Sequence, residues 1–203
     1  LVNCWPTTPR VLAPTLVEEF APVESAVSYA QWGVDHLFTV GANSLPKTSG
    51  IFTDSAFLTM LSFQLVQGDA KTALKEPHSI VVTRAFARQL FGDVEAMGHS
   101  LTIVTGVIED LPPNTDFQFD YLLPFRFLES IGAQDTFWGN NSVTTLVKLK
   151  PGVDLKTFNN QVKDVVQRHY ADGQHIEIFL YPLSSMRLHA RFEDGVAVGG
   201  RIE

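Results

Sequence analysis

The sequence has little cysteine and no long apolar stretch. Its only cysteine is Cys4, so cysteine usage does not distinguish a reducing compartment from an oxidising one. The longest stretch without a charged residue is the fourteen residues from Ser55 to Gly68, short of the roughly 20 that a membrane-spanning helix needs. The first residues include neither a start methionine nor a signal peptide. We therefore expect a fragment of a longer chain, with the targeting signal outside it.

Positive charge is also scarce. Fifteen Lys and Arg stand against 22 Asp and Glu, which gives a formal net charge of −7. Such a negative field repels phosphate backbones and anionic lipids, so we expect no nucleic-acid partner. Hydrophobic residues make up 45% of the chain and charged residues 18%, which is typical of a soluble globular protein with one substantial core or two smaller ones.

Motifs for catalysis and metal binding are missing as well. The six histidines lack the i, i+4 spacing of a helical zinc site, and the chain contains no Gly-x-Ser-x-Gly, Gly-Lys-Ser or Gly-Lys-Thr. The sequence thus predicts no catalytic residue, no metal ligand and no cofactor, and we expect the protein not to be an enzyme. An enzyme would have to assemble its site from residues without a local signature.

One segment is rich in oxygen ligands that a hard cation could use. It contains Asp110, Asn114, Asp116 and Asp120. Their spacing does not match an EF-hand loop, and two consecutive prolines stiffen the chain between them. We interpret these residues as turn and cap residues around the Pro-Pro corner.

Periodic patterns near the two ends of the chain predict alternating helices and strands. A helix over 11–20 is followed by a strand over 23–32. A strand over 142–150 precedes a helix that Asp154 caps and that ends before Gly173, and a further strand follows over 176–181. Strand, helix and strand in this order predict a right-handed βαβ crossover.

The middle of the chain has different signals. It predicts a hairpin over 33–50, a short helix capped by Asp54, a buried strand over 79–82, a helix over 84–91 that begins at Thr83 and ends at Gly92, and a central strand over 101–109. The chain has fifteen phenylalanines, and several of them cluster in this region, at Phe52, Phe57 and Phe63 and again at Phe117, Phe119, Phe125 and Phe127. Most are expected in the core, and a minority exposed together would form an apolar patch for a partner or lipophilic ligand.

Several linked strings resemble one protein family. They are DSAFLTMLSFQLVQGD (54–69), ALKEPHSIVVT (73–83), ARQLFGD (87–93), MGHSL (97–101), VTGVIEDLP (104–112) and FQFD (117–120). In this order they are similar to the MacB-like periplasmic core domain of FtsX-like ABC transporter permeases. His99 and Asp116 depart from the family pattern, which has Lys and His there. Resemblance is close over 52–125 and looser in the flanks.

The resemblance implies an α+β fold in which two βαβ units form a membrane-proximal lobe and a mixed α/β lobe is inserted. It implies a discontinuous membrane-proximal lobe of residues 1–35 and 140–190, an inserted lobe of residues 36–139, and a lead-in to a missing transmembrane helix over 191–203. The chain would be the loop between the first two transmembrane helices of a permease.

The implied function is that of a non-catalytic extracytoplasmic domain at the periplasmic face of the cytoplasmic membrane. It would couple cytoplasmic ATP hydrolysis to substrate export or mechanotransmission. Expected partners are a cytoplasmic ABC ATPase, a second permease subunit, and a periplasmic protein or a lipophilic or peptide substrate. A ligand-binding or sensor domain of a membrane protein is the alternative.

The family motif residues are expected to be structural. They are Gly68, Asp69, Phe91, Gly92, Gly98, Gly106, Asp110, Phe119 and Asp120. Gly68, Gly92 and Gly98 suit backbone positions with positive φ, where a side chain would be strained. We also expect Phe91 to close a helix end by packing on Val107.

Overall fold

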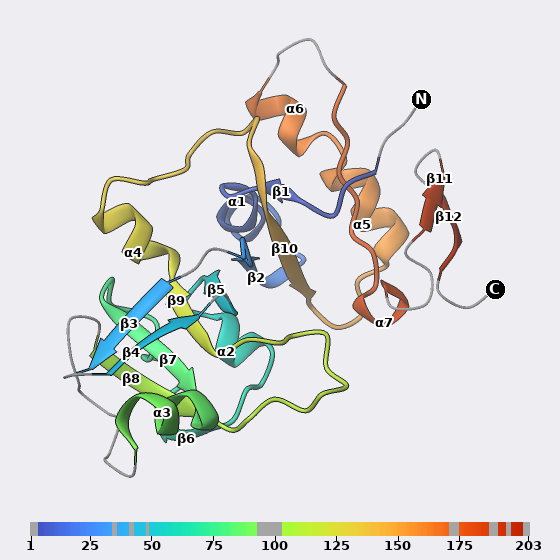
Figure 1. The fold of residues 1–203 in the computed structure, drawn as a ribbon. Coiled ribbons are helices and arrows are strands. Elements are labelled where there is room, and N and C mark those ends of the chain that lie inside the picture. Colours follow the sequence, from blue (N-terminus) through green and yellow to red (C-terminus); the bar gives the residue numbers. More distant parts are fainter. Residues whose placement is uncertain are drawn as a thin grey trace. The chain divides into compact units, whose positions relative to one another are not determined.

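The chain folds into two compact units (Figure 1). The computed structural model describes residues 4–33, 36–40, 43–47, 49–92, 103–170, 175–186, 191–193 and 196–200. Unit 1 comprises Leu1–Ala26 and Thr136–Glu203, and unit 2 comprises Val27–Asp135. Helices and strands occur in both, which confirms the predicted α+β class. None of the helices in the described ranges is both long and apolar enough to cross a membrane.

Unit 1 is built on three strands and two helical segments that flank them in sequence. Strand β1 (Thr8–Pro9) leads into helix α1 (Leu12–Glu19), and β2 (Val23–Ala30) follows and continues into unit 2. Strand β10 (Asn141–Leu149) lies between β1 and β2 and is antiparallel to β1. The helix and strand predicted over 11–32 are therefore confirmed.

The second helical segment of unit 1 starts where the sequence predicts. The Asp154 carboxylate accepts hydrogen bonds from the backbone N–H of Thr157 (2.8 Å) and from its hydroxyl (2.6 Å). The two bonds, the hydroxyl's foremost, hold the pKa of Asp154 below its ordinary value, because they favour the charged carboxylate. Asp154 is thus the N-cap of helix α5 (Leu155–Val162), as predicted.

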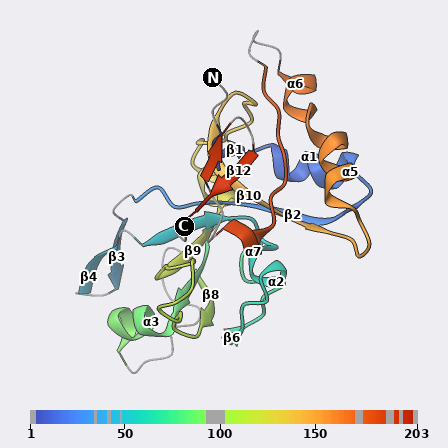
Figure 2. The ribbon, with the colours of Figure 1, turned by 90° about the vertical axis from the view of Figure 1, so that its right-hand side faces the viewer.

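The predicted single helix is interrupted after α5. A second helix, α6 (Val165–His169), begins after a turn at Lys163 and Asp164. The Lys163 carbonyl accepts a hydrogen bond from the N–H of Ile178 (2.9 Å), whereas a continuous helix would use it for residue 167. Both helices lie near α1 (Figure 2). The apolar stripe nevertheless continues through both of them and shares a core with α1. Its core members are Leu12, Leu16, Val23, Phe158, Val162, Val165 and Val166.

The strand predicted over 176–181 is wrong. Residues 175–182 are irregular, and the N–H groups of Ile176, Ile178 and Leu180 bond to groups between Asn159 and Gln167 instead of to a strand. The Asn159 side chain bonds both the N–H (2.8 Å) and the carbonyl (3.0 Å) of Leu180, and Gln167 accepts from the N–H of Ile176 (3.3 Å). The alternating pattern nevertheless predicted burial correctly, because the apolar side chains of the segment pack on the helix core. Without a second strand, the predicted βαβ crossover is not formed here.

The remaining described elements of unit 1 come from the end of the chain. They are a short helix α7 (Leu183–Met186) and an antiparallel pair of strands, β11 (Arg191–Glu193) and β12 (Val196–Gly199). The predicted helix end at Gly173 lies outside the described residues. Helix α6 itself ends at His169, and Tyr170 already has an extended backbone.

Unit 2 contains a mixed sheet. Its strands follow the order β2, β5 (Gly50–Thr53), β9 (Tyr121–Pro124), β7 (Ser79–Thr83), β8 (Ile103–Ile108), β6 (Leu65–Gly68). The pairs β5–β9 and β7–β8 are parallel, and the others with a described register are antiparallel. The predicted strand over 79–82 is confirmed, and the one predicted over 101–109 is confirmed over Ile103–Ile108, residues 101 and 102 lying outside the described ranges. All five residues of β7 are buried, as expected for a strand inside the sheet.

A hairpin and three short helices accompany this sheet. The predicted hairpin is present as β3 (His36–Val40) and β4 (Asn43–Lys47). The helices are α2 (Phe57–Met60), α3 (Arg84–Phe91) and α4 (Phe125–Ser130). The prediction that Asp54 caps α2 is wrong, because its carboxylate accepts from the N–H of Ser28 (2.6 Å) on β2 and the α2 N-cap is Ala56.

Candidate functional site

Two side chains, one at the end of β7 and one just beyond β8, accept hydrogen bonds from the first turn of α3. The hydroxyl of Thr83 accepts from the N–H of Phe86 (3.2 Å), which confirms the predicted cap. The carboxylate of Asp110, just beyond the end of β8, accepts from the N–H of Ala85 (2.7 Å). These two bonds leave fewer unsatisfied donors at the helix start. The motif residue Asp110 therefore fastens the end of β8 to the start of α3.

Gly68 and Gly106 face each other where β6 and β8 approach closely. They are partners in the antiparallel register. Gly68 has a φ of +93°, and a side chain on it would meet the carbonyl oxygen of Thr105. A Cβ on Gly106 would lie 2.9 Å from the Leu65 side chain and 3.2 Å from that of Val81. Gly68 is thus required by its positive φ and the nearby backbone of β8, whereas Gly106 leaves room for the side chains of Leu65 and Val81.

Gly92 ends α3 in the conformation that the sequence predicts. Its φ is +65°, and its N–H donates to the carbonyl of Arg88 (2.9 Å). Gly98 lies outside the described residues. Phe91, the last residue of α3, is half-buried, and its predicted contact with Val107 stays a prediction.

The motif pair Phe119 and Asp120 joins the hairpin region to the sheet. The Asp120 carboxylate accepts a short hydrogen bond from the Ser49 hydroxyl and pairs with the ammonium of Lys47 (3.1 Å). Its carbonyl accepts from the N–H of Thr83 (2.8 Å). Phe119 is buried and meets the ring of Phe63 edge-on, with centroids 5.8 Å apart. Sequence reasoning missed Lys47 and Ser49, because partners more than seventy residues from Asp120 leave no local signal.

The cation site considered for the acidic segment does not form. Asp110 caps α3, and Asp120 pairs with Lys47 and Ser49, so their carboxylates have different protein partners. Among the described residues, no three or more His, Cys, Asp and Glu side chains are grouped so that they could hold a metal ion. The reading of these residues as cap and turn residues fits the bond that Asp110 makes.

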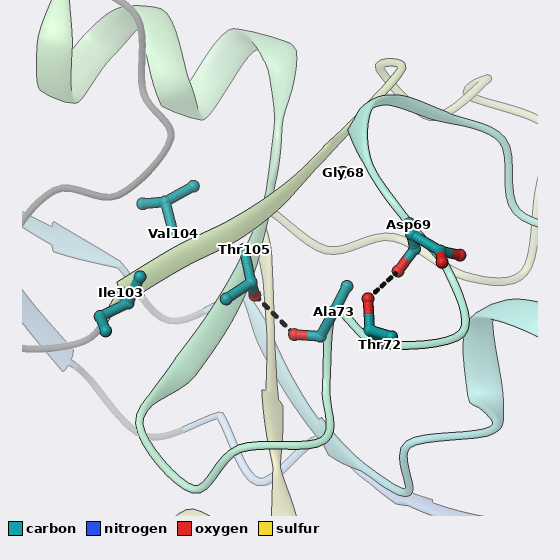
Figure 3. Close-up of a pocket in the computed structure, with 7 residues that line it drawn as sticks. All are labelled: Gly68, Asp69, Thr72, Ala73, Ile103, Val104 and Thr105. Atoms are coloured by element: carbon teal, nitrogen blue, oxygen red, sulfur yellow. Dashed lines mark hydrogen bonds between the residues drawn. The ribbon is translucent and has the colours of Figure 1, made fainter.

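An open groove lies beside the start of β8 (Figure 3). Its lining residues are Gly68, Asp69, Thr72, Ala73, Ile103, Val104 and Thr105, and its volume is about 490 Å³. The Thr105 hydroxyl donates to the carbonyl of Ala73 (2.5 Å), and the Asp69 carboxylate accepts from the N–H of Lys71 (2.9 Å). Asp69 carries a carboxylate toward this lining. Apart from Asp69, the described lining of the groove is uncharged.

Aromatic rings fill the interior of unit 2. One network joins Tyr29, Phe57, Phe63 and Phe117, with neighbouring centroids 5.4–6.3 Å apart. This arrangement confirms that much of the phenylalanine serves the core. In unit 1, Phe137 and Phe179 are exposed to 55% and 42%.

The sequence of residues 3–165 matches the family described as MacB-like periplasmic core domain. The chain belongs to this family. Domains of the MacB-like periplasmic core family are parts of ABC-transporter permeases, which pair with a cytoplasmic ATPase. No curated protein matches the chain significantly.

The fold of this MacB-like periplasmic core domain is similar to the folds of solved domains from permease and transporter proteins. A domain of a protein described as a permease from Porphyromonas gingivalis has 22% identity and a TM-score of 0.69, covering 90% of this chain and 86% of that one. The periplasmic region of MacB from Actinobacillus actinomycetemcomitans has 11% identity and a TM-score of 0.62, with coverages of 86% and 79%. The extracellular domain of the noncanonic ABC-type transporter YknZ from Gram-positive bacteria has 12% identity and a TM-score of 0.60, with coverages of 87% and 90%. At these identities, the likeness establishes a shared fold.

Proposed function

We propose that this domain transmits motion in an ABC transporter, coupling cytoplasmic ATP hydrolysis to substrate export or to mechanical work at the periplasmic face of the cytoplasmic membrane. The match to the MacB-like periplasmic core family over residues 3–165 carries the proposal. The domain performs no catalysis. It acts on a periplasmic protein, or on a lipophilic or peptide substrate, within a dimeric permease.

The two units are suited to move as separate bodies. Each has its own apolar interior, with the helix core around Phe158 in unit 1 and the aromatic network around Phe57 in unit 2. The chain passes from one unit to the other after Ala26 and returns after Asp135. A body with its own core can transmit a push or rotation without being deformed itself.

The parts of the chain have different roles in this proposal. Residues 1–35 and 140–190 form the membrane-proximal lobe, residues 36–139 form the inserted lobe, and residues 191–203 lead into a transmembrane helix. Closure of the partner ATPase dimer moves the membrane helices, and the membrane-proximal lobe passes that motion to the inserted lobe. The motif residues keep the inserted lobe stiff, since Asp110 and Asp120 each join separate elements of unit 2.

Distance measurements between spin labels test the proposal. Both Lys156 on α5 and Gln89 on α3 are exposed, one in each unit. Lys156→Cys and Gln89→Cys would be labelled in the full-length permease after Cys4→Ser and removal of other cysteines, in complex with its ATPase in nanodiscs. We expect the distance distribution between the two labels to shift between the nucleotide-free and the vanadate-trapped state.

A matched pair within one unit serves as the control. Labels at Glu18→Cys and Lys156→Cys both lie in unit 1, so their distance should be the same in both nucleotide states. An unchanged distance between the two units would contradict the proposal. If only an added ligand shifted that distance, the alternative of a ligand-binding or sensor domain would replace it, with the groove beside β8 as the first place to look.

A further inference from the structure

Strand β2 is shared between the two units, and the boundary falls inside it. Its residues 23–26 belong to unit 1, and its residues 27–30 belong to unit 2. The other crossing lies within residues 131–140, which contain no helix or strand and are mostly exposed. A strand with hydrogen-bonded neighbours yields less than an exposed irregular segment does. Strand β2 is therefore the stiffer of the two connections between the units.

Three hydrogen bonds converge on the backbone of Ser28, the second residue of unit 2. Its N–H donates to Oδ2 of Asp54 (2.6 Å). Its carbonyl accepts from the hydroxyl of Thr53 (2.9 Å) and from the N–H of Asp54 (3.3 Å). The regular ladder between β2 and β5 starts at the next residue, where Tyr29 is paired with Thr53. We call the three bonds among Ser28, Thr53 and Asp54 the β2 clamp.

The carboxylate of Asp54 replaces a backbone carbonyl in this arrangement. In an ordinary antiparallel pair, the N–H of Ser28 would donate to the main-chain carbonyl of Asp54. That carbonyl instead accepts from the N–H of Phe57 (3.0 Å), the first residue of α2. One residue thus joins β2, the end of β5 and the start of α2. Because Phe57 is fully buried and β5 is paired with β9 along its length, the clamp is fixed to the interior of unit 2.

Burial strengthens the clamp. Ser28 and Thr53 are both 0% exposed, so water does not compete for the bonds that they make. The bond from the Ser28 N–H ends on a carboxylate, and such charge-assisted bonds are about twice as strong as neutral ones. The Asp54 bond is therefore the strongest single contact expected in the clamp.

We propose that the β2 clamp is the contact through which β2 passes force between unit 1 and unit 2. Force along β2 displaces Ser28 relative to β5, and the three bonds resist this displacement together because they meet at one residue. In unit 1, β2 lies beside β10, where the N–H of Lys150 donates to the carbonyl of Pro22 (2.9 Å) and Lys148 pairs with Glu24 (2.6 Å). The biological role rests on the proposed motion of the domain, whereas the mechanical role can be tested in the chain itself.

Pulling single molecules with optical tweezers tests the clamp. Handles would be attached at Glu18→Cys in unit 1 and Gln89→Cys in unit 2, both exposed, in the 203-residue chain with Cys4→Ser. We expect Asp54→Ala to raise the rate at which the chain opens under constant force by about tenfold, because the bond between a backbone donor and a carboxylate is lost.

A second pair of handles separates this role from a general loss of stability. Lys71→Cys and Gln89→Cys are both exposed and both in unit 2, so force between these handles is not applied through unit 1. Asp54→Ala should accelerate opening between these handles at least about threefold less than opening between the two units. Equal acceleration in both directions of pulling would show that Asp54 only stabilises unit 2, and it would overturn the proposal.

Ser28→Ala is the matched control variant. The Ser28 hydroxyl has no hydrogen-bond partner among the described residues, and the clamp uses only the backbone of this residue. Ser28→Ala therefore keeps all three bonds and should open at the wild-type rate with either pair of handles.

A milder variant covers the case in which Asp54→Ala does not fold. Thr53→Val keeps the shape of the side chain and loses only the hydroxyl bond to Ser28, so it should raise the opening rate between the units by about threefold. An unchanged rate between the units, in whichever of the two variants folds, would overturn the proposal. Unchanged spin-label distances in the transporter would contradict the proposed function and leave these pulling results standing.

Discussion

The carboxylate of Asp110 accepts a hydrogen bond from the backbone N–H of Ala85, 25 residues earlier, across 2.7 Å. This bond links a motif residue at the end of a strand to the first turn of a helix that another motif residue, Gly92, terminates. Asp110, the first residue of the Asp-Leu-Pro motif, therefore holds α3 to the end of β8 in unit 2.

Replacement of the Asp110 cap should destabilise unit 2. We expect Asp110→Ala to lower the free energy of unfolding by about 1 kcal/mol, because one donor at the start of α3 loses its partner. Urea denaturation measures the change. Asp116→Ala removes an exposed carboxylate from the same segment and should stay within about 0.5 kcal/mol of wild type. Equal effects of the two substitutions would mean that the Asp110 bond contributes nothing to stability.

Because a backbone carbonyl lies close to Gly68, any side chain at this position is expected to destabilise the fold. Gly68→Ala should destabilise the domain by about 1–3 kcal/mol, because its φ is +93° and its Cβ would meet a backbone carbonyl. Gly132→Ala is the control, since Gly132 has a φ of +82° but open space around it. Thermal unfolding should show a larger loss for Gly68→Ala than for Gly132→Ala, and the reverse order would contradict the packing described here.

The cap of α5 should respond to acid. The Asp154 pKa lies below its ordinary value of 3.8 because the Thr157 hydroxyl and N–H bond the carboxylate. The cap therefore stabilises the fold above about pH 3.8 and is lost as the pH falls through the lowered pKa. NMR titration of Asp154 measures this, and Thr157→Val should raise the pKa by removing the hydroxyl. An unchanged pKa in Thr157→Val would show that the hydroxyl bond has no such effect.

The core of unit 1 should depend on Phe158. This ring is buried, and it meets the Phe20 ring edge-on at 6.0 Å. Phe158→Ala should lower the free energy of unfolding by about 3–5 kcal/mol, because it leaves a cavity between α1 and α5. Phe179→Ala removes the same side chain from a position that is 42% exposed and should cost less than about 1 kcal/mol. Denaturation curves of both variants measure these two changes in the free energy of unfolding.

The sequence predicted helix caps correctly where the capping side chain and its hydrogen-bond donor are close together along the chain. Thr83 and Asp154 each cap a helix through an N–H three residues ahead, so the necessary partners are adjacent in sequence. The same reasoning failed for Asp54, whose carboxylate bonds Ser28 on another strand. A side chain that can satisfy either a nearby or a distant donor cannot be assigned from spacing alone.

Alternation was informative about burial but not about pairing. Ile176, Ile178 and Leu180 face the helix core as the pattern predicts, yet Asn159 and Gln167 take the backbone hydrogen bonds that a neighbouring strand would have taken. An alternating apolar pattern indicates which side chains are buried, but it does not indicate which groups form hydrogen bonds with the backbone. The candidate site shows the same limit, because motif strings predicted Gly68 and Asp69 as structural residues without revealing that Thr105 lies beside them.

The amino-acid sequence by itself determined the family, the α+β class and the starts of α3 and α5, because motif order, periodicity and these two caps are encoded in residues close together along the chain. Only the tertiary structure decided the partners of Asp110, Asp120 and His169, which lie 25, 71 and 150 residues away. Such contacts depend on how packed elements bring distant side chains together, and their hydrogen bonds form only after that packing exists. The scarcity of cysteine fits this picture, since buried apolar side chains and polar contacts hold the described parts of each unit together.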